Sequence, residues 1–294
     1  MKHYFLLTLF LLTTSLNIHA DYDRDILMFL LKQVKNPPVE KYANYGIYRK
    51  GDILFCEGNS VLAETSNAAA EMILDGKYSE AVKLIEDSLV HAPLFLPFRY
   101  NLGIAYYFIS DYDKSLLNLN KAALIVPDYY MIYTQIGHAK ALSGKLEDAA
   151  REYRKALRLN PEYLDGYIFT GDIYLSQNRI SMAERYYNRA IEIDPFFNNA
   201  RIGKAKILFV KESYYKAYQE FLLIDTKTDY DKSLHYYLAE CAYKLQDYEI
   251  AYLNYEKLLE FRNSRFFLTI SLSLIQHKRD LSRKFYEQIK EGIE

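Results

Sequence analysis

The sequence predicts an all-α fold, a solenoid of repeated helix hairpins, and the main observation behind this prediction is a period of 34 residues. Four prolines keep that step, and so do two columns of small residues and one column of bulky residues. In order, they are Pro93, Pro127, Pro161 and Pro195; Ala81, Ser115, Ala149, Ala183, Ala217 and Ala251; Ala69, Gly103, Gly137, Gly171, Ala205 and Ala239; and Ile85, Leu119, Tyr153, Tyr187, Phe221 and Tyr255. A fixed period of about 20 to 50 residues marks a stacked-repeat architecture. We therefore expect function to lie on the surface of an elongated stack.

The composition supports helices and argues against some classes of partner. Only 11 Gly and 7 Pro occur in 294 residues, which leaves little material for sheet turns. Lys plus Arg is 37 and Asp plus Glu is 38. A nucleic-acid partner would call for a clustered basic surface, so this balance argues against one. Tyr is abundant at 30 residues, whereas Trp is absent.

Residues 1–20 have the layout of a secretory signal peptide. A basic start at Lys2 is followed by an apolar run from Phe5 to Leu12, and Ala20 offers a small residue for cleavage. The run is well short of the roughly 20 residues that a membrane-spanning helix needs. We expect export to a bacterial periplasm with cleavage after Ala20. The alternative is an uncleaved segment that tethers the protein to the inner membrane.

Residues 21–61 are less regular and are predicted to form an N-terminal cap or arm. An apolar stretch from Ile26 to Leu31 suggests a helix, which Asn36-Pro37-Pro38 would end. A short β-hairpin is predicted around Lys50-Gly51. The segment could fold on the first repeat as a cap, lie on a membrane surface or dock a partner.

One repeat shows how the pattern encodes a helix hairpin. Ile132 and Ile136 belong to an apolar stripe with steps of three and four, which predicts a helix. Ser143-Gly144 is a turn signal, and a second apolar stripe then runs to Asn160-Pro161, which ends it. Ala149 on the second helix is small enough to let the two helix backbones approach closely. A lone hairpin cannot cover its own apolar face, so stability must come from stacking.

This pattern resembles the tetratricopeptide repeat family. The residues that match its Leu-Gly, Ala, Phe, Ala and Pro positions are Ile136-Gly137, Ala149, Tyr153, Ala156 and Pro161. The resemblance implies a right-handed α-α superhelical solenoid of about six hairpins with capping segments at both ends. The repeats within residues 62–265 are 62–95, 96–129, 130–163, 164–197, 198–231 and 232–265.

The last repeats depart from the family pattern. The fifth and sixth have Asp229 and Asn263 in place of the closing proline. They also carry Ile224 and Leu258 where earlier repeats have alanine, which predicts wider or tilted packing. Residues 266–294 are predicted to form a final, degenerate pair of capping helices.

No catalytic or metal-binding pattern is present in the sequence. It has no glycine-rich phosphate loop and no His-Glu-x-x-His, and its six histidines are scattered. Cys56 and Cys241 are five repeats apart, too far for a disulfide, so we expect both to be unpaired. The sequence therefore predicts no catalytic residue, metal, cofactor or small-molecule substrate.

In the family that the chain resembles, the first helix of each repeat lines a concave groove. The residues that the resemblance places there are Tyr100, Ile104, Tyr107, Phe108, Thr134, His138, Ile168, Asp172, Ile202, Lys206, Phe209, Tyr236, Glu240 and Tyr243. Some members clamp a C-terminal carboxylate with Lys, Arg and Asn, but here Tyr100 and Thr134 occupy such places. Because tyrosine is enriched at interface hot spots, we expect the groove to bind an apolar or aromatic peptide segment.

These features predict a non-catalytic scaffold or adaptor of the bacterial cell envelope, with another envelope protein as its partner. The alternative is a self-associating structural protein, in which the groove or the N-terminal arm of one copy receives another. A subunit of an enzyme would need a composite site shared with a partner.

Overall fold

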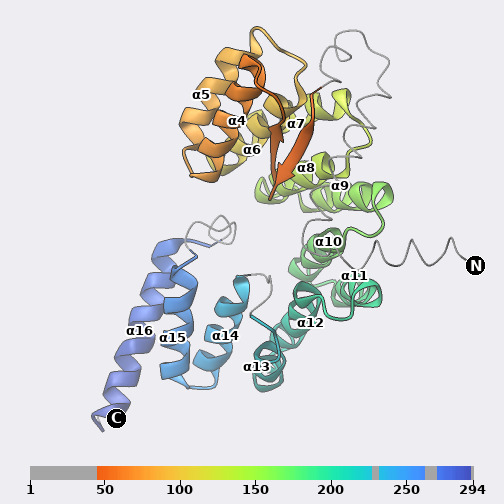
Figure 1. Cartoon of the computed structure of the whole chain (residues 1–294). Helices are drawn as coiled ribbons and strands as arrows, with labels where there is room; N and C mark the ends of the chain where they lie inside the picture. The colour runs from red at the N-terminus through yellow and green to blue at the C-terminus, as the bar shows by residue number, and fades with distance from the viewer. Residues whose placement is uncertain (1–44, 227–231, 262–269, 293–294) are drawn as a thin grey trace, which may run out of the picture. The chain divides into compact units, whose positions relative to one another are not determined.

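The computed structural model describes residues 45–226, 232–261 and 270–292. Thirteen helices and one β-hairpin make up this part of the chain, so the predicted all-α class is confirmed (Figure 1). The chain divides into two compact units, residues 1–143 and residues 144–294, which we call unit 1 and unit 2. Among the described helices, none combines the length and the apolarity that a bilayer crossing requires. The predicted signal peptide and the helix predicted near Ile26 lie outside the described residues.

The described part of unit 1 begins with a β-hairpin. Strands β1 (Ile47–Lys50) and β2 (Ile53–Cys56) pair antiparallel, with Tyr48 opposite Phe55. Gly51 occupies the turn with a φ of 57°, a left-handed conformation that glycine adopts without steric cost. The hairpin predicted around Lys50-Gly51 is therefore confirmed.

Five helices follow in unit 1. They are α4 (Val61–Leu74), α5 (Tyr78–Leu89), α6 (Leu96–Phe108), α7 (Tyr112–Ile125) and α8 (Tyr130–Leu142). Side-chain caps start two of them: the Ala63 amide donates to the Ser60 hydroxyl, and the Lys114 amide donates to the Asp111 carboxylate. Such caps satisfy main-chain donors that the first turn of a helix leaves without a partner.

Unit 2 contains eight described helices. They are α9 (Leu146–Leu159), α10 (Leu164–Ser176), α11 (Ile180–Ile193), α12 (Asn198–Val210), α13 (Tyr214–Leu222), α14 (Ser233–Lys244), α15 (Tyr248–Leu259) and α16 (Leu272–Lys290). Helix α13 has 9 residues against 14 in α9 and α11. Ile224 consequently lies beyond the end of α13, and it packs in the core. Asp229 and Asn263 lie outside the described residues.

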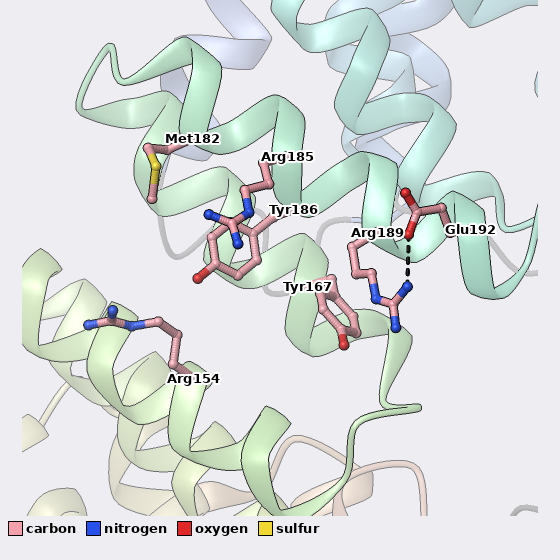
Figure 2. Close-up of a pocket in the computed structure, with 7 residues that line it drawn as sticks. All are labelled: Arg154, Tyr167, Met182, Arg185, Tyr186, Arg189 and Glu192. Carbon is pink, nitrogen blue, oxygen red and sulfur yellow. Dashed lines mark hydrogen bonds and ion pairs between the residues drawn. The ribbon is translucent and has the colours of Figure 1, made fainter.

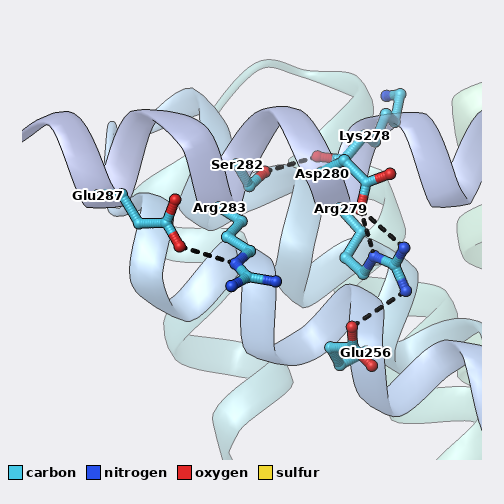
Figure 3. Close-up of polar contacts among 7 residues, drawn as sticks. All are labelled: Glu256, Lys278, Arg279, Asp280, Ser282, Arg283 and Glu287. Carbon is cyan, nitrogen blue, oxygen red and sulfur yellow. Dashed lines mark hydrogen bonds and ion pairs between the residues drawn. The ribbon is translucent and has the colours of Figure 1, made fainter.

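The C-terminal segment shows one long helix, α16, in its described part, where the sequence predicted a pair. Ile275 and Ser282 are its buried residues. Figure 3 shows the polar contacts of this helix: Arg279 donates to Glu256 of α15 at 3.1 Å, and Arg283 pairs with Glu287 at 2.8 Å. The Ser282 hydroxyl donates to the Lys278 carbonyl, so its burial leaves no polar atom unsatisfied.

The turn inside each repeat places one residue in the left-handed region of backbone space. These residues all hold the same repeat position: Gly76, Ser110, Gly144, Asn178, Glu212 and Gln246. Only two of the six are glycine, although non-glycine residues pay a steric cost there. In the other four turns, each of which lies within one unit, the packing of the two helices offsets this cost.

The small columns permit close helix packing, as the sequence predicted. The ring of Tyr187, which has no exposed surface, lies between Gly171 and Gly203 of two successive repeats. A Cβ atom added to Gly171 would lie 2.5 Å from the ring, and one added to Gly203 would lie 2.6 Å from it. Because real Cβ atoms do not approach so closely, both positions require glycine.

The two cysteines are buried and form no disulfide within the described residues. Burial raises the pKa of Cys56 to about 12, against a smaller lowering by a hydrogen bond with Ser66. Burial, with the nearby charge of Glu240, also raises the pKa of Cys241 to about 12. Both therefore act as small hydrophobic residues.

Candidate peptide-binding site

Two asparagines hold the β-hairpin on the helices of unit 1. Asn67 of α4 and Asn101 of α6 occupy the same position of successive repeats. Asn101 Nδ2 donates to the Leu54 carbonyl at 2.7 Å, and the Leu54 amide donates to Asn101 Oδ1 at 2.9 Å. Asn67 makes the same two bonds with Cys56, both at 2.8 Å. Alternate residues of a strand point their main-chain groups to one edge, so the two carboxamides clamp that edge of β2.

The clamped strand changes the predicted groove in unit 1. Tyr100 and Ile104 of α6 are 0% exposed, and β2 packs against both α4 and α6. Neither side chain offers surface to a partner, so both are core residues, in contrast to the groove positions predicted for them. Thr134 is likewise buried, and its hydroxyl donates to the Tyr130 carbonyl at 3.4 Å.

The sequence analysis missed Asn67 and Asn101. A signal was available, because the same amide side chain recurs after 34 residues in the repeat frame. The resemblance drew attention to neighbouring positions of the first helices, which other family members use. An asparagine that pairs with main chain is easily read as an ordinary polar surface residue.

An aromatic cluster remains partly accessible in unit 1, at the turn ends of its hairpins. It comprises Tyr78, Tyr107, Phe108, Tyr112 and His138. Tyr78 stacks on Phe108 with ring centroids 4.6 Å apart, and Phe108 meets Tyr107 edge to face at 5.3 Å. Tyr107 also contacts Tyr112 and His138, each at 6.3 Å. Tyr107 is mostly buried, whereas the other four are half-buried. Three predicted site residues, Tyr107, Phe108 and His138, thus come together.

In unit 2, the predicted groove residues include a line of charges. Asp172, Lys206 and Glu240 hold one position of three successive repeats. Lys206 pairs with Asp172 at 3.4 Å, and the Tyr187 hydroxyl donates to Asp172 at 2.6 Å. Their charges are therefore compensated within the protein, which the sequence did not predict.

Like Lys206, Glu240 is a buried charged group. Its side chain is 8% exposed, it accepts a hydrogen bond from the Tyr255 hydroxyl at 2.6 Å, and it pairs with Lys278 of α16. Burial and this carboxylate raise the pKa of Tyr255 far above its usual value. Burial and the same carboxylate also raise the pKa of Tyr236. A buried charge needs such partners, so Glu240 joins α14, α15 and α16.

The remaining predicted residues of unit 2 divide between core and aromatic pairs. Ile168 and Ile202 are buried in the core. Phe209 meets Tyr214 with ring centroids 5.4 Å apart, and Tyr243 meets Tyr248 at the same separation. These pairs repeat the arrangement of Tyr107 with Tyr112. The sequence analysis missed the partner rings, although an aromatic pair five residues apart recurs in three repeats. In the residues that the structure describes, no group of three or more metal-ligating side chains occurs.

A known protein family matches the middle part of the chain. A family model described as "Tetratricopeptide repeat" matches residues 134–196. The "Small glutamine-rich tetratricopeptide repeat-containing protein 2" of Saccharomyces cerevisiae is 29% identical over 108 residues, which cover 37% of this chain. This chain spans 28% of the length of that relative.

Solved structures share the fold. The Cut9 and Hcn1 complex of the APC/C gives a TM-score of 0.57 at 19% identity, over 75% of this chain and 44% of that chain. PilW, a type IV pilus biogenesis factor, gives 0.54 at 20% identity, over 72% of this chain and 99% of that one. Pseudomonas aeruginosa pilF gives 0.52 at 13% identity, over 71% and 95%. The repeat frame, the helix hairpins and the family match agree that this chain contains tetratricopeptide repeats.

Proposed function

We propose that this protein is a non-catalytic scaffold that binds an apolar or aromatic segment of another protein through the aromatic cluster of unit 1. Proteins of the tetratricopeptide repeat family are protein-interaction scaffolds. The observation that carries the proposal is the aromatic cluster, in which Tyr78, Phe108, Tyr112 and His138 retain exposed surface. Aromatic side chains contribute large contact areas at interfaces.

The cluster is suited to binding because its rings are already fixed by one another. Phe108 is held between Tyr78 and Tyr107, so little rotational freedom remains to be lost on association. Helices α4 and α6 also hold an extended strand by its main chain, through Asn67 and Asn101. That strand is the protein's own β2. This strand supports the proposal because it shows the kind of segment that such helix faces accommodate.

The double substitution Tyr107→Ala/Phe108→Ala is expected to weaken partner binding about tenfold or more, because it removes central rings of the cluster. The partner is first identified by photocrosslinking in intact cells from a crosslinking residue at Phe108. Affinity is then measured with the purified partner. Phe196→Ala/Tyr215→Ala is the matched control, since these rings are 84% and 65% exposed on unit 2.

The outcomes separate the alternatives. Circular dichroism must show unchanged helicity in both variants, so that any loss of affinity reports on the cluster. Equal affinity of the Tyr107→Ala/Phe108→Ala variant and the control would rule out the aromatic cluster as the binding site. Crosslinks only between copies of this chain would support the self-associating alternative.

We further propose that the protein acts in the bacterial cell envelope, on the basis of the signal-like residues 1–20. The mature protein is expected in the periplasmic fraction, and its N-terminal residue is expected to be Asp21. Mass spectrometry of the fractionated protein tests this. An intact N-terminus in the membrane fraction would support the tethered form, and an intact cytosolic protein would contradict export.

A further inference from the structure

A cationic cavity lies in unit 2, and none of its lining residues was predicted for the groove. Its volume is about 460 Å³, and helices α9, α10 and α11 contribute its walls (Figure 2). The lining side chains that matter here are Arg154, Tyr167, Met182, Arg185, Tyr186 and Arg189. Three guanidinium groups therefore face one cavity, in a protein whose net charge is −1.

The positive charge of this cavity is only partly compensated. Glu192 is its one lining carboxylate, and it pairs with Arg189 at 2.8 Å. Within the described part of the chain, Arg154 and Arg185 form no ion pair; Arg154 Nε donates only to the Ala150 carbonyl, at 3.3 Å. By contrast, nearby Arg179 pairs with Glu147 at 2.8 Å. Two guanidinium groups are left to attract an anion.

The arginines are spread along the cavity. Figure 2 shows that Arg154 extends from α9 on one side, whereas Arg185 and Arg189 project from α11 on the other. The Tyr186 ring lies between Arg154 and the α11 arginines in this view. Burial raises the pKa of Tyr186, and the charges of Arg154 and Arg185 partly oppose that rise, as expected for cations that flank one ring.

The walls between the arginines are apolar or neutral. Met182 and the two tyrosine rings supply contact surface. The Tyr167 hydroxyl donates to the Pro161 carbonyl at 2.9 Å, which fixes that ring at the cavity wall. A ligand that fits must therefore carry separated negative charges joined by less polar atoms.

We propose that this cavity binds an acidic peptide segment, whose carboxylate side chains pair with Arg154 and Arg185. Guanidinium groups bind carboxylates through two parallel hydrogen bonds, which gives both strength and orientation. A single phosphate would favour donors that converge on one point, and Glu192 adds a repulsive charge. A nucleic acid would favour a longer basic surface. The site goes beyond the aromatic cluster, because it gives the scaffold a second docking surface with the opposite chemical preference.

Fluorescence anisotropy with a labelled peptide of alternating glutamate and alanine tests the proposal. The full mature chain is expected to bind this peptide, more weakly as salt is added, and not to bind its glutamine counterpart. Arg154→Gln/Arg185→Gln is expected to weaken binding at least about tenfold. The control Lys204→Gln/Lys216→Gln removes the same charge from exposed positions of unit 2 and is expected to change affinity less than about twofold.

Several results would overturn the proposal. They are no binding by the unaltered protein, an equal loss in the control variant, or tighter arginine-dependent binding of inorganic phosphate or of a short oligonucleotide. If the double glutamine variant loses helicity, Arg154→Lys/Arg185→Lys replaces it. That variant keeps the charge but cannot form the bidentate hydrogen bonds of a guanidinium group with a carboxylate. Partly weakened peptide binding would therefore support the site, and unchanged affinity would contradict it.

Discussion

Tyr187→Ala is expected to lower the free energy of unfolding of unit 2 by about 3–5 kcal/mol, as for other fully buried aromatic residues. The ring fills the space between Gly171 and Gly203, and neither glycine has a side chain that could move into the cavity. The surrounding helices would have to shift to close it. Chemical denaturation followed by circular dichroism measures the loss.

A conservative variant separates the contribution of the Tyr187 ring to stability from that of its hydroxyl group. Tyr187→Phe keeps the ring and removes only the hydroxyl that donates to Asp172. Asp172 retains Lys206, so we expect a cost of about 1–2 kcal/mol. If the alanine variant costs no more than the phenylalanine variant, the ring does not stabilise the crossing as described.

Asn101→Leu is expected to destabilise unit 1 by about 2–4 kcal/mol, because it leaves two buried main-chain groups of Leu54 without partners. Leu54 is fully buried, so water cannot replace the lost carboxamide. The expected local effect is faster hydrogen exchange at the Leu54 amide. Chemical denaturation measures the loss in the free energy of unfolding. Mass spectrometry measures the rate of hydrogen exchange around Leu54.

Asn120→Leu is the matched control, because Asn120 lies exposed on α7. The same change of side chain there is expected to alter stability by less than about 0.5 kcal/mol. Unchanged exchange at Leu54 in the Asn101→Leu variant would show that the carboxamide does not hold β2.

The repeat pattern predicted the helices well because its signals are local. The apolar stripe through Ile132 and Ile136 belongs to α8, and the turn at Ser143-Gly144 separates α8 from α9. Four other turns were harder to recognise, since residues such as Ser110 and Glu212 take the left-handed conformation without glycine's advantage. Their geometry depends on packing between helices, which no single position encodes.

The candidate site was predicted less completely. The repeat frame correctly brought Tyr107, Phe108 and His138 together, because side chains at fixed repeat positions lie on one side of the stack. It identified an inner face but gave no information on what covers that face. Tyr100 was assigned to the groove, yet it is buried in a unit whose own β2 packs on α6. The hairpin lies outside the periodic part of the chain, so periodicity could not place it.

The charge line of unit 2 shows a second limit. The resemblance placed Asp172, Lys206 and Glu240 on the groove, where each could have met a partner protein. Their pairing depends on side-chain conformations across neighbouring repeats and on α16, which supplies Lys278. A sequence gives the order of such charges but not which of them neutralise one another.

The clamp on β2 also constrains the order in which a nascent chain matures. Leu54 and Asn101 are 47 residues apart, and Cys56 and Asn67 are 11 apart. While only β2 and α4 are available to fold, the strand can engage Asn67, but the second carboxamide, on α6, is still missing. The β-hairpin is therefore secured at both points only after α6 has joined it.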